Sequence, residues 1–374
     1  MALDEKQQIR AAARRAGFQL CAFSRVAPLP HADFVRQWLA DGNAADMAYI
    51  ERGLAKRLDP SRILPEARTI ISVGWRYQPP PLPPVDWRGE LRGRIAAYAA
   101  GIDYHSTVAH GLRQLAADVA ALRPGAAVRP YVDTGALLER EWASLGGVGW
   151  FGKNTNLLHT EHGSYFFLGE LLTTAEIEPD APLADHCGTC TRCLDWCPTG
   201  ALRPGFTLDA RVCISYLTIE HRGIIPRALR AQIGNWIFGC DICQEVCPWN
   251  EKLVRDQGVP DTDELLPYLP DLLRLDDEHF QRRFHRSAVR RAKRDGFVRN
   301  VAVALGNTRN PVAVAPLAAA LLDDAAPLVR AHAAWALGMI GTRGGRQALD
   351  AARRREVDDA VRSEIDAALA DGAG

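Results

Sequence analysis

The first 180 residues alternate between two hydrophobic patterns. RTIISVGWRY (68–77) and GSYFFLGELLTT (163–174) are continuous runs rich in Ile, Val and aromatic residues, which predicts buried β-strands. STVAHGLRQLAADVAALR (106–123) has apolar residues at every third or fourth position, which predicts an amphipathic helix. PPPLPP (79–84) suits neither element and predicts a loop. We therefore expect an α/β (α+β) domain in this half.

The C-terminal part carries a different pattern, an internal repeat. VRNVAVALGN, VRAHAAWALGMIG and VRSEIDAALA begin at positions 298, 329 and 361, so they lie 31 and then 32 residues apart. PVAVAPLAAALLDD (311–324) supplies a partner helix between the first two. Paired helices at this period resemble the HEAT-like family, whose units stack into an α-solenoid. The alternative is a set of unrelated alanine-rich helices.

The composition suits a globular protein of two or three domains, with 374 residues, 47% of them hydrophobic and 24% charged. Lys and Arg balance Asp and Glu at 45 each, so any nucleic-acid binding must come from a local patch. No apolar run follows Arg14 and Arg15, which are therefore expected on a helix surface rather than in an export signal. No run approaches the ~20 apolar residues of a membrane helix, and we expect a cytoplasmic protein.

Eight of the nine cysteines lie between positions 187 and 247. In a reducing compartment this density indicates metal or redox chemistry rather than disulfides. The ninth, Cys21, is expected to be a small buried apolar residue. Cys187, Cys190, Cys193 and Cys197-Pro198 match the bacterial ferredoxin run C-x2-C-x2-C-x3-C-P.

A second half follows in CDICQEVCPWN (240–250), where the expected first cysteine is missing and Cys213 is the obvious substitute. The fourth cysteine of each ferredoxin run serves the other cluster, so two 4Fe–4S clusters are predicted. The first is expected on Cys187, Cys190, Cys193 and Cys247. The second is expected on Cys197, Cys213, Cys240 and Cys243. Structural zinc is the competing interpretation, but it leaves Cys193 and the repeated Cys-Pro ending without a role.

The segment YVDTGALLEREWASLGGVGWFGKNTNLL (131–158) holds two further candidates. Gly147-x4-Gly152-Lys153 begins a phosphate-binding loop, but Asn154 stands where that motif needs Ser or Thr, which argues against ATP hydrolysis. Asp133 follows a short β-like run. It either caps the helix expected from about Ala136 or, if burial raises its pKa, donates a proton in a reduction.

The motifs YVDTGALLERE, GWFGKNTNLL, GSYFFLGELLTT, CISYLTIEHRG and WIFGCDICQEVCPWN, together with the ferredoxin run, resemble the epoxyqueuosine reductase family. The resemblance covers nearly the whole chain. It implies an oxidoreductase that reduces epoxyqueuosine to queuosine at the wobble position of tRNA, the last step of queuosine biosynthesis. It also implies cobalamin, an external low-potential electron donor, and kinship with reductive dehalogenases.

The resemblance also implies roles for individual residues. Asp133 would be the proton donor. The cobalamin site would draw on Arg57, Tyr98, Asp133, Lys153, Asn154 and Ser164. Two of these have ordinary alternatives, a surface ion pair for Arg57 and a core position for Tyr98.

A tRNA substrate requires a cationic surface, and RRFHRSAVRRAKRDGFVR (282–299) has eight Lys or Arg against one Asp. The alternative to RNA binding is a solvent-exposed, charged helix face without a binding role. Because the run is too lopsided for internal ion pairing, we expect phosphate contacts. The candidate tRNA-binding residues are His221, Arg222, Arg282, Arg283, Arg286, Arg290, Arg291, Lys293 and Arg294.

The expected organisation is a cobalamin-binding α/β domain (1–180), a ferredoxin-like double-cluster domain (181–255), a basic connector (256–295) and a HEAT-like domain (296–374). The solenoid and the zero net charge are compatible with a monomer. Two other functions fit parts of the pattern. One is a reductive dehalogenase of small molecules, and the other is a non-catalytic iron–sulfur protein that binds tRNA.

Overall fold

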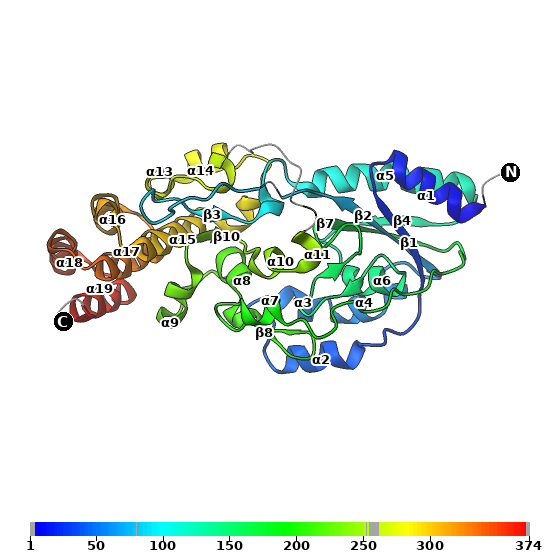
Figure 1. The fold of residues 1–374 in the computed structure, drawn as a ribbon, viewed down its shortest axis with the longest axis horizontal. Coiled ribbons are helices and arrows are strands. Elements are labelled where there is room, and N and C mark those ends of the chain that lie inside the picture. The colour runs from blue at the N-terminus through cyan, green and yellow to red at the C-terminus, as the bar shows by residue number, and fades with distance from the viewer. Residues whose placement is uncertain (1–3, 80, 252, 254–261, 372–374) are drawn as a thin grey trace.

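The computed structural model describes residues 4–79, 81–251, 253 and 262–371. The molecule is elongated, with the N-terminal sheet at one end, the C-terminal helices at the other and the cysteine-rich segment between them (Figure 1). Of the expected loop 79–84, Pro80 lies outside the described residues, and the others are irregular as predicted.

The N-terminal half is built on a four-stranded sheet in the order β1-β2-β7-β4, and every pairing is antiparallel. Both predicted strands are present and lie side by side in the middle of this sheet. The sheet strands are β1 (Leu20–Arg25), β2 (Thr69–Arg76), β4 (Val128–Tyr131) and β7 (Phe166–Thr173). The expected α+β class is confirmed.

Helices cover both faces of this sheet. On one face, α1 (Glu5–Arg15) and α5 (Tyr104–Leu122) bury residues such as Ile9 and Leu112. The helix predicted at 106–123 is therefore confirmed. On the other face, Trp142 of α6 (Glu139–Leu145) is fully buried. The remaining short elements of this half are α2 (Ala32–Ala40), α3 (Ala48–Arg52), α4 (Leu54–Leu58), η1 (Pro60–Arg62), β5 (Trp150–Phe151) and β6 (Leu157–Leu158).

Two expectations about this half concern single residues. Arg14 and Arg15 are exposed on α1, as predicted. Cys21 is half-buried on β1, packs against the core, and has its pKa raised to about 12 by burial. Its thiol therefore behaves as a small apolar group.

The cysteine-rich segment is a chain of short elements. Its β10 pairs in parallel with β3 (Arg94–Ile95), so part of the N-terminal half packs into the core of the second half. The short η2 (Ala97–Ala99) follows β3 in the N-terminal half. The elements of the cysteine-rich segment are α7 (Arg192–Asp195), β8 (Leu202–Arg203), β9 (Thr207–Leu208), η3 (Ala210–Val212), α8 (Ile214–Ile219), α9 (Arg227–Arg230), η4 (Ala231–Ile233), β10 (Trp236–Phe238), α10 (Ile242–Glu245) and α11 (Pro248–Glu251). The expected boundary at 255/256 lies outside the described residues.

The C-terminal helices form the predicted solenoid, in which the three Val-Arg segments lie on α15, α17 and α19. Gly306 on α15 allows a close helix crossing, because a Cβ there would lie 2.8 Å from the Ala336 Cα. The elements of this part are α12 (Thr262–Leu265), α13 (Leu269–Leu273), α14 (Asp277–Arg283), η5 (Ala288–Ala292), α15 (Lys293–Thr308), η6 (Pro311–Ala313), α16 (Val314–Asp323), α17 (Pro327–Ile340), α18 (Arg343–Arg355) and α19 (Asp359–Asp371).

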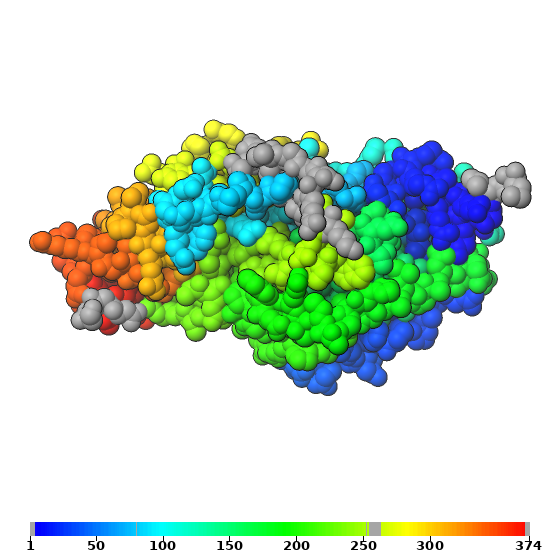
Figure 2. Space-filling view, in the orientation of Figure 1, coloured from blue at the N-terminus to red at the C-terminus, as the bar shows by residue number. Residues whose placement is uncertain are grey.

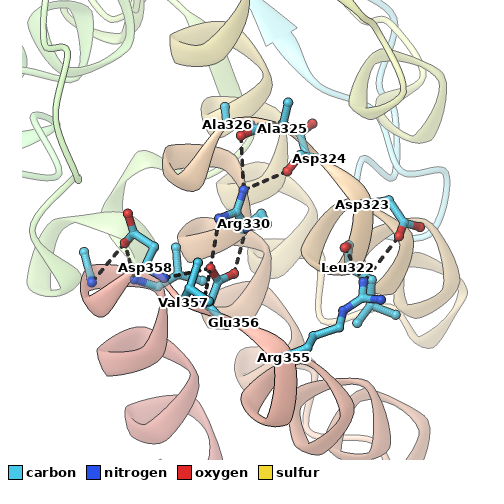
Figure 3. Close-up of polar contacts among 12 residues, drawn as sticks. Leu322, Asp323, Asp324, Ala325, Ala326, Arg330, Arg355, Glu356, Val357 and Asp358 are labelled. Carbon is cyan, nitrogen blue, oxygen red and sulfur yellow. Dashed lines mark hydrogen bonds and ion pairs between the residues drawn. The ribbon is translucent and has the colours of Figure 1, made fainter.

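Ion pairs between successive helices stiffen the solenoid. Arg330 on α17 donates two hydrogen bonds to the carboxylate of Glu356, of 2.7 and 2.9 Å, and a further one to the Asp324 carbonyl (Figure 3). Arg355 reaches the Leu322 carbonyl and the Asp323 carboxylate. These contacts hold α17, α18 and the turn before α17 in one arrangement.

In the part of the chain that the structure describes, no helix combines the length and apolar character that crossing a bilayer requires.

Candidate functional site

The eight clustered cysteines are all free thiols, and they fall into two groups by their mutual electrostatic influence. In the first group, burial raises the pKa of Cys193 to about 11, and Cys247 and Cys187 add to that rise. The pKa of Cys247 is raised by burial and then by Cys187 and Cys190. Each thiol thus lies close enough for its charge to be felt by its neighbours. The first group is Cys187, Cys190, Cys193 and Cys247.

In the second group, burial raises the pKa of three thiols. Burial and the charge of Cys197 raise the pKa of Cys213. Burial also raises the pKa of Cys240, and Cys213 and Cys197 contribute to that shift. The pKa of Cys243 is raised well above its ordinary value by burial, then by Cys240 and Cys213, with a smaller effect from Cys193 of the first group. The second group is Cys197, Cys213, Cys240 and Cys243, and it adjoins the first.

The two groups face different environments. The loops around Cys187, Cys190 and Cys193 lie at the surface in the middle of the molecule (Figure 2), and Trp196 beside them is 65% exposed. Lys153 holds this region by donating from Nζ to the carbonyl oxygens of Gly188 and Cys190, at 2.7 and 3.0 Å. Lys153 is therefore occupied with the thiol loop.

The second thiol group instead lines a cavity of about 330 Å³ against the N-terminal half. All four of its cysteines contribute to the wall. The opposite side is aromatic, because the Phe167 ring stacks on Tyr104 at 4.0 Å and on Tyr77 at 4.5 Å between centroids. Tyr98 also lines the cavity and packs against Tyr104 and Phe238. Flat apolar rings facing thiolates suit a large planar redox cofactor.

Two of the expected cofactor residues, Asn154 and Ser164, also line this cavity. Their hydrogen bonds join the N-terminal half to the second thiol segment. Asn154 Nδ2 donates to the Cys243 carbonyl at 3.3 Å, and Ser164 Oγ donates to Gln244 Oε1 at 2.7 Å. Asn154 lies in the turn 152–156, which joins β5 to β6 as a hairpin, so the strand–loop–helix of a phosphate-binding loop is absent there.

Asp133 lies on a loop in the left-handed region, with φ of 49°. The helix expected from about Ala136 begins only at Glu139, and its N-cap is Leu138, which makes no side-chain cap. The capping interpretation of Asp133 is therefore wrong. Its Oδ2 instead lies 3.0 Å from His105 Nε2, and its backbone N–H donates to Glu139 Oε1 at 2.6 Å.

Arg57 supports the same loop from α4. Its Nη1 donates to the carbonyl oxygens of Leu137 and Gly135, at 3.2 and 3.5 Å, while its buried Nε has no hydrogen-bond partner among the described residues. Arg57 is thus no surface ion pair. A backbone conformation with positive φ at a non-glycine residue requires such external support.

The ionisation of Asp133 differs from the expectation. We expected burial to raise its pKa, but the hydrogen bond from His105 lowers the pKa of Asp133, and a Tyr104 hydroxyl contact adds to this effect. The same hydrogen bond raises the pKa of His105 to about 9. Burial and the charge of Asp133 raise the pKa of Glu139 to about 7. The proton that is available for transfer therefore lies on His105, which hydrogen-bonds directly to Asp133.

Sequence reasoning did not single out His105, Asp103, Tyr104 or Glu139. A signal was present, because Asp-Tyr-His at 103–105 ends the stretch RIAAYAAGIDYH that also holds Tyr98. An acid, an aromatic ring and an imidazole in direct succession at a helix start are chemically conspicuous. Only the fold brings them to Asp133, 28 positions further along the chain.

The expected tRNA-binding residues near the clusters make internal contacts. His221 lies 3.2 Å from Asp46 Oδ2 through Nδ1 and 3.1 Å from the Ile224 carbonyl through Nε2. Arg222 donates to the backbone carbonyls of Ile219, Ala292 and Arg291. Arg222 therefore holds the turn after α8 against the basic segment, and His221 holds it against Asp46.

Ion pairing in the basic segment is more extensive than expected, because carboxylates arrive from outside it. Arg282 pairs with Glu278, Arg291 with Glu220, and Arg294 with Asp324 as well as Asp295. Arg299 is fully buried. Among the described residues, four exposed cations of the segment have no carboxylate partner within ion-pair distance: Arg283, Arg286, Arg290 and Lys293. Of the paired arginines, Arg291 lies near enough for its charge to lower the pKa of Asp133.

Three sequence families match parts of the chain. Residues 186–250 match a 4Fe–4S double cluster binding domain, which confirms iron–sulfur over zinc. Residues 57–134, from Arg57 to just past Asp133, match the family described as epoxyqueuosine reductase QueG, DUF1730. Residues 287–370 match HEAT repeats, which confirms the repeat interpretation.

Relatives that align along almost their full length have the same family description. An epoxyqueuosine reductase of Xanthomonas campestris pv. campestris is 39% identical over 90% of this chain and 97% of its own length. One of Bacillus cereus is 34% identical over 97% of this chain and 96% of its own length.

Two solved structures are similar along almost the whole chain. The crystal structure of an epoxyqueuosine reductase with an epoxyqueuosine-modified tRNA-Tyr stem loop has a TM-score of 0.92 and 31% identity over 99% of both chains. An epoxyqueuosine reductase from Bacillus subtilis, described with its catalytic aspartate loop swung out of the active site, has a TM-score of 0.89 and 30% identity over 98% of both chains.

Proposed function

The chain belongs to the epoxyqueuosine reductase family, and from that premise we propose that it reduces epoxyqueuosine in the anticodon loop of tRNA to queuosine. The observation that carries the proposal is the placement of the Asp133 loop. Through Tyr104, this loop adjoins a cavity whose far wall is made by four thiols of an iron–sulfur domain. Electrons and protons can thus meet at one place.

The thiol grouping supports the expected division of the cluster ligands. The first cluster would be held by Cys187, Cys190, Cys193 and Cys247. The second would be held by Cys197, Cys213, Cys240 and Cys243. Such clusters carry single electrons. Because only the second group lines the cavity and the loops around three cysteines of the first group are exposed, electrons from an external low-potential donor would enter at the first.

The cavity also fits the expected cobalamin, on the grounds of its flat aromatic wall and its contact with the second thiol group. Bound there, cobalamin would supply a low-potential cobalt centre. Tyr98, Asn154 and Ser164 line the cavity and would contact it. Lys153 and Arg57 would act indirectly, since they hold the thiol loop and the Asp133 loop.

Removing the epoxide oxygen as water consumes two electrons and two protons, so the site must deliver protons to that oxygen. We assign this delivery to the Asp133 carboxyl group. Its position on a strained loop, 58% exposed and held by His105 and Glu139, suits a group that must meet a substrate. The aspartate loop of the Bacillus subtilis relative, described as catalytic, supports the same assignment.

The substrate would lie across the mouth of this site. Arg283, Arg286, Arg290 and Lys293 are the cations we expect on phosphates. Arg291 is placed to link that surface to the site, since its guanidinium lies 5.7 Å from the Tyr49 ring and acts electrostatically on Asp133. Arg282, Arg294, His221 and Arg222 would contribute mainly by holding the surface in shape.

The remaining expectations complete the proposal. We propose a monomer that works in the cytoplasm, where thiols stay reduced and tRNA is found. The four expected domains remain a proposal about organisation. A small-molecule dehalogenase or a non-catalytic tRNA-binding protein is disfavoured by the family membership.

Mass analysis of nucleosides tests the function directly. The anaerobically reconstituted and reduced protein, loaded with cobalamin, is incubated with tRNA containing epoxyqueuosine, and the digested tRNA should contain queuosine. Iron analysis of the same sample should return about eight iron atoms per chain, the content of two four-iron clusters. Unchanged epoxyqueuosine with full iron and cobalamin occupancy would refute the proposed reaction.

A further inference from the structure

The imidazole of His105 lies between two carboxylates. Its Nδ1 is 2.6 Å from Asp103 Oδ1, and its Nε2 is 3.0 Å from Asp133 Oδ2. A neutral imidazole has one donor and one acceptor nitrogen, whereas an ionised carboxylate only accepts. Both contacts are satisfied together only when both ring nitrogens carry protons. The geometry therefore describes an imidazolium with one N–H directed at Asp133.

The surrounding structure fixes this ring. Asp103 is the N-cap of α5 and accepts the His105 backbone N–H at 3.0 Å, while its own backbone N–H donates to the Arg286 carbonyl at 2.6 Å. The Tyr104 ring stacks on the His105 ring, with centroids 4.2 Å apart, and also on the Phe167 ring, with centroids 4.0 Å apart. Turning the ring would break its hydrogen bonds to Asp103 and Asp133 and its stacking on Tyr104.

We propose that Asp103 and His105 form a relay that reprotonates Asp133, so that one carboxyl group delivers both protons of the reduction. This inference rests on the proposed function. His105 Nε2–H passes its proton to the Asp133 carboxylate, and Asp133 gives that proton to the departing oxygen. After His105 is reloaded, the same two transfers deliver the second proton. Asp103 accepts from Nδ1–H throughout and stabilises the imidazolium. The His105 side chain is 32% exposed, so water can reload it.

The charged groups around His105 and Asp133 also favour a protonated His105 beside an ionised Asp133. Asp133, Asp103 and Glu139 are acidic groups around one imidazole, and the cations that act on them are Arg140, the chain neighbour of Glu139, and Arg291. The pKa of His105 is accordingly raised to about 9, so it holds its proton at neutral pH. A depressed pKa, as at Asp133, makes a carboxyl group a poor proton store on its own. His105 and Asp103 act through Asp133 and are positioning residues.

The test compares His105→Gln and Asp103→Asn with wild type in the loaded enzyme. Glutamine keeps a donor near Asp133 but carries no transferable proton, so kcat should fall by about 100-fold while the Kd for an epoxyqueuosine stem loop is unchanged. Asp103→Asn should cause a smaller loss, about tenfold. His110→Gln is the matched control, since His110 is exposed on the same helix and its ring lies 3.2 Å from Gln114, away from the Asp133 network. This variant should change neither quantity.

The pH profile separates a relay from a structural role. Wild-type kcat should fall as pH rises through about 9, where His105 loses its proton, and this limb should move to lower pH in His105→Gln. In protein without cofactors, nitrogen NMR should find the His105 imidazole titrating near 9, and near its ordinary value in Asp133→Asn.

Three results would overturn the proposal. An unchanged alkaline limb in an active His105→Gln enzyme excludes the relay alone. So does a His105 that titrates near its ordinary value in the wild-type protein without cofactors. Failure of the loaded wild type to form queuosine refutes the proposed function and the relay with it, and the NMR titration distinguishes this case because it needs no turnover.

Discussion

Charged side chains form two networks in this molecule, one in the solenoid and one around the Asp133 loop. At the edge of the solenoid, Arg230 of α9 is fully buried and donates from two guanidinium nitrogens to the two oxygens of Glu364 on α19, at 2.9 and 2.6 Å. Arg330 binds Glu356 in the same forked way. Around Asp133, two carboxyl groups instead share one imidazole, and the Glu139 carboxyl group accepts the Asp133 backbone N–H.

The difference lies in whether a carboxylate faces guanidinium groups or other carboxyl groups. A guanidinium keeps its proton in proteins, so the solenoid pairs are permanently charged and their role is to hold helices together. In the Asp133 network the carboxyl groups compete, and their pKa values are driven apart: that of Asp133 falls while that of Glu139 rises to about 7. Completed pairs fix structure, whereas unequal sharing leaves protons that can move near neutral pH.

The strongest way to test this contrast is Asp133→Asn. The amide has the same shape but cannot deliver a proton, so kcat should fall by about 10³-fold. Cluster content, cobalamin content and the Kd for the tRNA stem loop should stay as in wild type, because Asp133 caps no helix. Turnover is measured by nucleoside mass analysis and binding by fluorescence anisotropy. Normal turnover by this variant would remove Asp133 from the chemistry.

For Arg230→Met we expect the reverse of the Asp133→Asn result, a loss of stability without a loss of kcat. This change leaves the buried Glu364 carboxylate with less compensation, and we expect the free energy of unfolding to fall by about 3 kcal/mol. The folded fraction should keep its normal kcat. Urea denaturation followed by circular dichroism measures the stability.

Arg353→Met is the matched control for Arg230→Met. Arg353 also pairs with a carboxylate, Asp366, but both side chains are more than half exposed, so the loss should stay below about 1 kcal/mol. Equal losses in the two variants would mean that burial does not distinguish the two ion pairs.

A smaller effect is expected for Glu356→Gln, and its pH dependence is the useful part. The hydrogen bonds from Arg330 lower the pKa of Glu356 from 4.5 to about 2, so the ionised pair stabilises the fold above pH 4.5. That contribution, about 2 kcal/mol, should be lost as pH falls through about 2. The wild type and variant should therefore differ in urea midpoint at pH 7 and converge in acid. A constant difference across that range would contradict the assignment.

The smallest effect is expected for Glu139→Gln, which removes a group that titrates at about pH 7 from the Asp133 network. Glutamine keeps an oxygen to accept the Asp133 backbone N–H, so the loop should stay in place and kcat should change by no more than about threefold. The profile of kcat against pH should lose its inflection near pH 7. A loss as large as that of Asp133→Asn would make Glu139 a proton donor in its own right.

Much of the architecture was readable before the structure, because it depends on local pattern. The strands at 69–76 and 166–173, the helix at 104–122 and the helices that carry the Val-Arg repeats all follow from the spacing of apolar residues. The same holds for the iron–sulfur domain, since three of the four thiols of the first group lie within seven residues of each other, from Cys187 to Cys193.

The contacts and ionisation of single polar residues could not be predicted from the sequence in the same way. The amino-acid order alone determined that eight thiols, a solenoid and an acidic turn are present. Only the tertiary structure decided that Asp133 meets His105 instead of capping a helix, and that Glu220 and Asp324 neutralise arginines of a segment that looked unpaired. The physical reason is the separation along the chain over which each effect acts. Hydrophobic periodicity and thiol spacing act between near neighbours in the chain, whereas the charge on a side chain depends on whichever groups folding brings within a few ångströms.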